Sequence, residues 1–251
     1  MSSEKLSTFF FDSKEIIELR RQVQPYSPKE DLWSWYVLRR ISIYITLLLN
    51  RLKFSPNTVS WLSLFFVLLS GLCMVLATPV SFMLAFLSYN IGYLLDCVDG
   101  ELARMTNRTS KLGYFIDMLI RAATLPVFIS FVVAYLVLTD YLPIPNWGLL
   151  LLYFTVISIV MSLLLPLSYD LTHTKMEQED PVQKIRNKSI LFEFTGFILG
   201  LPGFFVTILL ALLLSYLTGY LFVEYYLLFF IAVLILKVLL RFVITVKTFS
   251  K

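Results

Sequence analysis

Long apolar segments make up most of this chain, and short polar connections separate them. A helix needs about 20 mostly apolar residues to cross roughly 30 Å of hydrocarbon. Segments of that length cover approximately residues 58–77, 80–98, 112–138, 147–167, 192–216 and 221–243. The pattern therefore predicts an all-α polytopic membrane protein with six transmembrane helices.

The residues before the first predicted span show a different periodicity. In residues 31–53, apolar side chains recur at intervals of three and four, and Arg39, Arg40, Arg51 and Lys53 make the flanks cationic. This pattern is typical of an amphipathic helix that lies in the membrane interface. A seventh buried helix stays open as an alternative, but the charges would make spanning costly.

Lysine and arginine fall on one side of the predicted spans. With a cytosolic N-terminus, the cytosolic segments and the adjoining helix ends hold every Lys and Arg except Arg121, and the three outside loops hold none. This positive-inside bias predicts that both termini are cytosolic. Residues 1–30 then form an N-terminal cytosolic segment and residues 31–251 a single membrane domain, which we expect in a prokaryotic cell membrane.

Composition supports the bilayer and excludes several classes of function. Of the 251 residues, 58% are hydrophobic and 15% are charged, and the mean hydropathy is +0.79, which is far more apolar than a soluble domain. The net charge of +4 does not indicate nucleic acid, because the basic residues flank apolar segments instead of forming one patch. Cys73 and Cys97 lack metal-ligand spacing to each other or to His173, so we expect no zinc site.

Two smaller patterns also carry expectations. In the fifth predicted span, Gly196 and Gly200 form a GxxxG pair with Gly203 beyond it, which predicts close helix packing within or between chains. Several arginines before the first span are expected to meet anionic headgroups. These are Arg20, Arg21, Arg39 and Arg40.

Charged side chains gather where the second predicted span ends and the third begins. Residues 93–121 read YLLDCVDGELARMTNRTSKLGYFIDMLIR. Asp96 and Asp99 are spaced i, i+3 on a helix and share a face, and a hairpin between the two helices can bring Asp117 to the same point. A carboxylate at the membrane edge costs free energy unless it faces a polar cavity, an ion or a partner.

Carboxylates that converge in a setting of low dielectric constant repel each other. A hard divalent cation with oxygen ligands is the usual means of keeping them ionised. We therefore predict Mg²⁺ or Mn²⁺ as the cofactor, bound by Asp96, Asp99 and Asp117. Because such ions commonly add phosphate oxygens of a substrate to their ligands, a diphosphate-bearing substrate fits this site.

Small residues and one guanidinium stand at helical spacing around these acids. Gly100, Ala103 and Gly113 leave room for a ligand to approach the backbone, and Arg104 is placed to bind a phosphate bidentately. Each small residue taken alone also has a plain interpretation as a packing contact. Taken together, Asp-x2-Asp-Gly-x2-Ala-Arg-x8-Gly-x3-Asp is a pattern that chance would rarely produce.

At these residues the chain resembles the CDP-alcohol phosphotransferase family, whose signature is D-x2-D-G-x2-A-R-x8 or 9-G-x3-D-x3-D. The resemblance implies six membrane helices behind an amphipathic helix, a Pro-Asn entry to the first span (here Pro56 and Asn57), and homodimers. It implies transfer of a phosphoalcohol from a CDP-linked donor to a hydroxyl acceptor with two divalent ions and release of CMP. The implied metal ligands are Asp96, Asp99 and Asp117, and the residues implied to border the CDP moiety are Gly100, Ala103, Arg104 and Gly113.

The sequence departs from this signature at its last position. The family has a fourth aspartate there, implicated as a metal ligand and as the base that activates the acceptor hydroxyl, whereas this chain has Arg121. A guanidinium stays protonated near neutral pH, so it neither accepts that proton nor binds a cation. Asp140 and Glu193 are the substitutes considered, and Asp140 is predicted on the wrong side of the membrane.

The sequence leaves more than one function open. In the first hypothesis the chain is a transferase of phospholipid biosynthesis, acting on a donor such as CDP-diacylglycerol. In the second it is a catalytically impaired homologue that binds metal and nucleotide or partners an active subunit. Four retained residues of the signature favour the enzyme, and Arg121 favours the impaired homologue. The four are Asp96, Asp99, Asp117 and Arg104. A transporter or channel has weaker support, because the sequence shows no inverted repeat.

Overall fold

The protein is described by a computed structural model that covers residues 6–25, 31–139, 152, 155–156, 158–160, 162, 194 and 196–249. This part of the chain is helical and contains no strand, as the sequence predicts. Five of the helices found there are long and apolar enough to cross a membrane. The predicted fourth span, residues 147–167, lies mostly outside the described residues. This span, which would bring the number to six, therefore stays a prediction.

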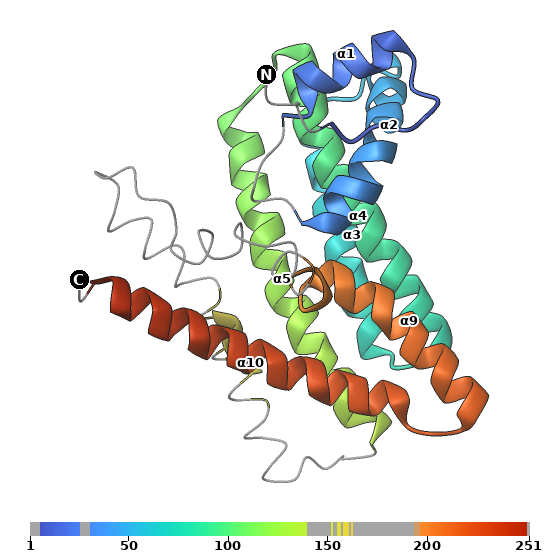
Figure 1. Ribbon diagram of the computed structural model, residues 1–251, viewed down its shortest axis with the longest axis vertical. Coiled ribbons are helices and arrows are strands. Elements are labelled where there is room, and N and C mark those ends of the chain that lie inside the picture. The colour runs from blue at the N-terminus through green and yellow to red at the C-terminus, as the bar shows by residue number, and fades with distance from the viewer. Residues whose placement is uncertain are drawn as a thin grey trace. The chain divides into compact units, whose positions relative to one another are not determined.

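In chain order the helices are α1 (Lys14–Val23), the π-helical turn η1 (Ser34–Leu38), α2 (Arg39–Arg51), α3 (Pro56–Val75), α4 (Pro79–Thr106), α5 (Lys111–Leu138), α9 (Leu201–Thr218) and α10 (Phe222–Phe249). Helices α3, α4, α5 and α10 follow predicted spans, α9 covers only the later part of one, and α1 lies where no helix was predicted (Figure 1). Helix α4 continues past its predicted end at residue 98. One helix therefore carries the whole signature from Asp96 to Arg104.

The chain forms two compact units, to which α3, α4 and α5 each contribute. The first unit comprises Met1–Leu69 with Leu87–Ala123, and the second comprises Ser70–Phe86 with Thr124–Lys251. All the signature residues belong to the first unit.

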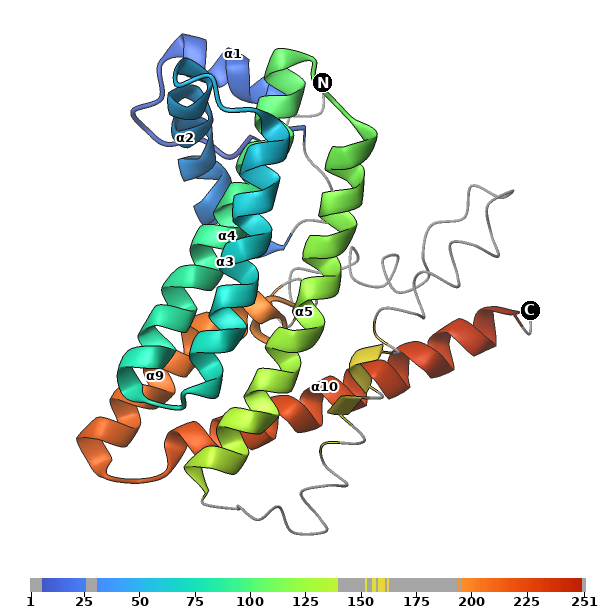
Figure 2. The ribbon, with the colours of Figure 1, turned by 180° about the vertical axis from the view of Figure 1, so that it is seen from behind.

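Helices α2, α3 and α4 lie close together in the first unit (Figure 2), and an apolar core joins them. Its buried centre is Val59, Val98 and Leu102, and the side chains packed around it are Ile45, Leu49, Leu95 and Met105. Helices α3 and α4 approach closely at Gly92, where an added Cβ would lie 2.9 Å from Val67 Cγ2. Glycine is therefore required for this approach.

Helix α2 confirms the helix predicted within residues 31–53 and shows which face it buries. Ser42 and Thr46 are buried beside Ile43, whereas Ile41 and Leu48 are exposed. The buried face is thus partly polar and an apolar face points outwards. An outward apolar face is what an interfacial helix presents to lipid.

The expectation that Arg20 and Arg39 meet anionic headgroups is wrong. Arg20 is fully buried and pairs with Asp12 Oδ2 at 2.9 Å. Arg39 pairs with Glu101 Oε1 at 3.1 Å. Residues 6–25 fold against α2 and α4, so Arg20 has its partner within the same segment and Arg39 has its partner on α4.

Stacked aromatic rings hold the second unit. Phe131 of α5 stacks on Phe204 of α9 with ring centroids 3.8 Å apart, and Phe230 of α10 lies 4.7 Å from Phe204. Gly219 follows α9 with φ of 73°. Because glycine adopts this left-handed conformation without strain, it closes α9 before the turn into α10.

The fifth predicted span, residues 192–216, is interrupted. At Gly200 the backbone is extended, with φ of −97° and ψ of 170°, and α9 begins at the next residue. Gly196 and Gly200 therefore do not lie on one continuous helix, and the helix packing predicted from this pair stays a prediction. An added Cβ at Gly203 would lie 2.2 Å from Phe197 O, so this glycine lets the chain fold back closely on itself.

Candidate active site

A cavity of about 480 Å³ lies in the first unit, where α4 ends and α5 begins. Its wall comes from α3, α4, the α4–α5 connection and α5, with one side chain from α2. All eight site residues predicted from the sequence line it: Asp96, Asp99, Gly100, Ala103, Arg104, Gly113, Asp117 and Arg121. The hairpin that the sequence predicts therefore brings them to one cavity, while their chemical roles stay predictions.

Backbone geometry ends α4 sharply next to this cavity. Asn107 has a left-handed backbone with φ of 53°. Arg108 N donates to Ala103 O at 2.9 Å, and Asn107 N donates to Arg104 O at 3.3 Å. This pair of hydrogen bonds is the Schellman motif, which satisfies the last carbonyls of a helix. It lets the chain turn directly into α5 and sets the hairpin.

A cap fixes the start of α5 against α3. Ser110 Oγ accepts a hydrogen bond from Gly113 N at 3.0 Å and donates to Asn57 Oδ1 at 3.0 Å. An added Cβ at Gly113 would lie 3.3 Å from Asn57 Oδ1. The signature glycine therefore makes room for the contact between the two helix starts. Asn57, from the Pro-Asn entry to the first span, lines the cavity as well.

The three predicted carboxylates differ in their partners. Ser60 of α3 donates a hydrogen bond to Asp99 Oδ2. Asp117 Oδ2 lies 3.1 Å from Arg121 NH2 one helical turn later, with 38% of the Asp117 side chain and 63% of the Arg121 side chain exposed. The residue that replaces the expected fourth aspartate thus offsets the charge of its neighbour.

The donor set around Asp96 and Asp99 suits a hard cation. In the part of the chain that the structure describes, no group of three or more Asp, Glu, His or Cys side chains could hold a metal ion. Asp96 and Asp99 do share the cavity with the oxygen donors of Asn57 and Ser60. Mg²⁺ is commonly held by one or two carboxylates plus substrate phosphates, so these residues fit it, whereas Asp117 is engaged by Arg121.

Arginines give this cavity a cationic wall. Among the described residues that line it are four arginines and three aspartates, the arginines being Arg39, Arg104, Arg108 and Arg121. Such a wall suits a phosphate-bearing ligand. Arg39 and Arg108 are not among the site residues predicted from the sequence. The position of Arg108 in the connection between the two helices could have indicated that it lines the cavity. Arg39 lies on a different helix, far from the signature in the sequence, and no sequence pattern indicates its place at the cavity.

Gly100 lies next to the space that the Arg104 side chain fills. An added Cβ at Gly100 would lie 3.3 Å from Arg104 NH2. The Nε of Arg104 donates to Val23 O at 2.6 Å. The signature glycine therefore leaves space for the guanidinium, which is held between α4 and the end of α1.

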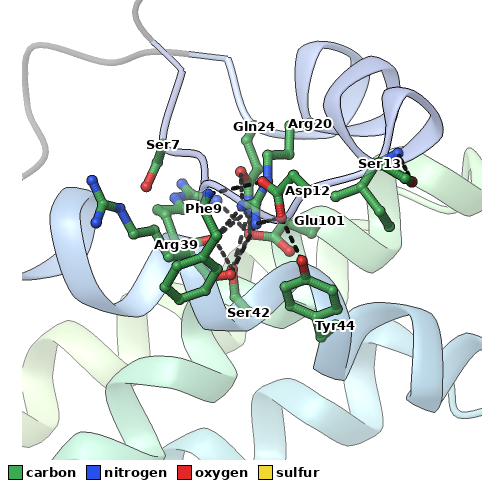
Figure 3. Close-up of polar contacts among 12 residues, drawn as sticks. Ser7, Phe9, Asp12, Ser13, Arg20, Gln24, Arg39, Ser42, Tyr44 and Glu101 are labelled. Atoms are coloured by element: carbon green, nitrogen blue, oxygen red, sulfur yellow. Dashed lines mark hydrogen bonds and ion pairs between the residues drawn. The ribbon is translucent and has the colours of Figure 1, made fainter.

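Glu101 has a different role from the acids beside it in the sequence. It is fully buried, does not line the cavity and faces the N-terminal segment (Figure 3). A position two residues after Asp99 lies about 200° around the helix. This helical spacing is the signal in the sequence that Glu101 faces away from the cavity.

Comparison with known proteins supplies an independent finding. Residues 53–217 match the sequence model of the CDP-alcohol phosphatidyltransferase family. A similar protein is the "Bifunctional IPC transferase and DIPP synthase" of Thermococcus kodakarensis, which is 33% identical over 132 residues. That match covers 48% of this chain and 29% of the relative, so the chain matches less than a third of the relative's length.

Proposed function

Because the chain belongs to the CDP-alcohol phosphatidyltransferase family, we propose that it transfers a phosphoalcohol group, a phosphatidyl group in particular, from a CDP-linked donor to a hydroxyl acceptor. The donor class includes CDP-diacylglycerol, the second product is CMP, and the reaction serves phospholipid synthesis. The observation that carries the proposal is that all the signature residues line one cavity with a cationic wall. The name of the Thermococcus relative, which describes a transferase and a synthase, supports the same kind of reaction.

Each side of the cavity has a proposed task. Asp96 and Asp99 hold Mg²⁺ or Mn²⁺, and Asp117 completes the acidic side. Members of this family generally depend on a divalent metal, and such an ion, when bound, neutralises charge on the diphosphate. The residues proposed to border the CDP moiety are Gly100, Ala103, Arg104 and Gly113.

The proposed reaction breaks one P–O bond and forms another. The acceptor oxygen attacks the phosphorus that carries the alcohol, and the bond from this phosphorus to the oxygen of CMP breaks, so CMP leaves with the bonding electron pair. The acceptor proton needs a base, which Arg121 cannot provide. We assign it to Asp117, whose side chain is partly exposed. Arg121 then stabilises negative charge next to that carboxylate.

The surroundings of the site suggest how substrates arrive. Five long apolar helices support a bilayer location, from which a lipid donor reaches the cavity laterally. We propose that the chain works as a homodimer and that the cavity opens to the cytosol, as the distribution of lysine and arginine predicts.

One observation favours a second candidate function, that of a catalytically impaired homologue that binds metal and nucleotide or partners an active subunit. The ion pair between Asp117 and Arg121 occupies one predicted metal ligand. Loss of a general base typically costs on the order of 10²- to 10⁴-fold in rate. Such a loss would hide turnover while leaving binding intact.

CMP release decides between the two functions. Purified protein is incubated with CDP-diacylglycerol, Mg²⁺ or Mn²⁺, and a panel of polyol and amino-alcohol acceptors, beside Arg121→Asp and Asp99→Ala. We expect activity in the unmodified protein, and its loss in Asp99→Ala and after chelation of the metal. If only Arg121→Asp releases CMP, the chain is the impaired homologue. If neither the unmodified protein nor Arg121→Asp releases CMP with any acceptor, the transferase proposal is wrong.

A further inference from the structure

A buried polar network connects the N-terminal segment, residues 6–25, to the cavity wall (Figure 3). At its centre, Glu101 accepts hydrogen bonds from Gln24 Nε2 at 2.9 Å and Thr46 Oγ1 at 2.8 Å. It also accepts a hydrogen bond from Ser42 Oγ and pairs with Arg39 at 3.1 Å. A buried carboxylate is tolerated only with such partners, so Glu101 fixes the position of the Arg39 side chain.

Arg20 extends this network through α1. Its guanidinium pairs with Asp12 at 2.9 Å and donates to Arg39 O at 2.8 Å and Arg40 O at 2.9 Å. It also donates to Gln24 Oε1 at 3.1 Å. One buried side chain thus ties α1 to the first turn of α2, from which Arg39 reaches the cavity.

The end of α1 holds the second cavity arginine. Arg104 Nε donates to Val23 O, and Val23 is the last residue of α1. Carbonyls at a helix C-terminus carry partial negative charge and lack partners within the helix. This carbonyl therefore suits a guanidinium, and the contact orients Arg104 where it lines the cavity.

We propose that residues 6–25 position the phosphate-binding wall of the site. Arg20 and Gln24 act through Arg39 and Arg104, and hold these two guanidiniums in the geometry that binds the diphosphate of a nucleoside diphosphate ligand. The ligand class rests on the proposed function. Arginine side chains lose rotamer freedom when they bind a ligand, so fixing them beforehand raises affinity.

A purely structural network would have a different consequence. It would change the stability of the protein without changing ligand affinity in a protein that still folds. A positioning role instead changes affinity, and raises the donor KM more than it lowers kcat. The two roles are therefore separable by measuring affinity and folding on the same variants.

The test measures binding of CDP, in the presence of Mg²⁺, to the full-length chain and its Arg20→Gln variant by calorimetry. The matched control is Arg21→Gln, which removes the neighbouring charge outside the network. Arg21 is exposed and pairs with Glu18 at 3.1 Å. Thermal unfolding in the same detergent checks folding. We expect the Kd of CDP to rise roughly tenfold or more in Arg20→Gln, as expected for misplaced binding groups, to recover partly in Arg20→Lys, and to stay unchanged in Arg21→Gln.

The outcomes separate this inference from the proposed function. A folded Arg20→Gln protein that binds CDP as well as the unmodified chain overturns the inference. If Arg20→Gln does not fold, Gln24→Leu, which removes the amide bridge and keeps the volume, decides in the same way. If the unmodified protein binds CDP but releases no CMP, the transferase fails and the inference is decided by the variants. If it does not bind CDP at all, both fail.

Discussion

Small residues of the signature have specific contacts in this structure. Gly100 leaves space for the Arg104 guanidinium, and Gly113 leaves space for Asn57. The departure from the signature also has a partner, since Arg121 pairs with Asp117. Each of these residues therefore shapes a polar side chain at the cavity, in addition to any role in helix packing.

Replacing Gly100 by alanine should weaken donor binding without lowering the thermal stability of the protein. In Gly100→Ala, the new Cβ crowds the far end of a flexible Arg104 side chain, while alanine favours the helix by about 1 kcal/mol. We expect the thermal midpoint to hold or rise and the donor KM to increase several-fold. The control is Gly92→Ala, whose Cβ would lie 3.0 Å from the Val67 backbone nitrogen and should lower the midpoint. If the donor KM of Gly100→Ala stays unchanged, the assignment of Arg104 to the donor is contradicted.

Between elements, polar contacts hold the N-terminal segment in place. Asp12 accepts hydrogen bonds from Tyr44, Arg20 and Phe9 N. Burial raises the pKa of Asp12, but these hydrogen bonds and the charge of Arg20 outweigh it, so the net pKa lies below its usual value of 3.8. Burial, followed by the hydrogen bond to Asp12, raises the pKa of Tyr44 above its usual value of 10.0.

These shifts predict a pH window for the docking of α1. Because the Asp12 pKa is lowered on folding, its contribution is fully present above about pH 4 and is lost as the pH falls through the lowered value. The contribution of Tyr44 is present below about pH 10 and is lost as the pH rises through its raised pKa. Hydrogen exchange of the α1 amides, corrected for intrinsic rates, should become faster at both pH limits because α1 is released there. Asp12→Asn should remove the acid limit, and an unchanged limit would contradict this account.

For the molecule as a whole, the apolar helices and the charges between them predict how the chain is oriented in the membrane. Helix α4 has the length of a span and carries the signature near one end. Its other end follows a connection without lysine or arginine. The positive-inside bias therefore predicts that the cavity end of α4 lies in the cytosol.

Labelling the two ends of α4 tests this orientation. In a Cys73→Ala, Cys97→Ala background, we expect a membrane-impermeant maleimide to label Thr109→Cys from the cytosolic side and Val80→Cys from the opposite side. Oriented vesicles that expose one face at a time provide the measurement. Labelling of both positions from one side would show that α4 does not span the membrane.

Much of this architecture was predictable because it depends on local patterns. Apolar length indicated the five helices long enough to span a membrane that the described residues contain, and helical spacing placed Asp96 and Asp99 on one face. The signature spacing also predicted the hairpin that brings Asp117 to the same cavity. Residues 192–216 were the exception, because a continuous apolar run does not reveal the extended backbone at Gly200.

By itself, then, the sequence predicted the helical membrane fold, eight of the residues that line the cavity and the loss of the fourth aspartate, since each is a matter of composition or of spacing along the chain. Only the tertiary structure decided the partners of the charged side chains. Glu101 meets Gln24 and Arg39 across 77 and 62 positions of sequence. No periodicity records such pairings, because they arise when separate helices bury polar groups that must find partners in each other.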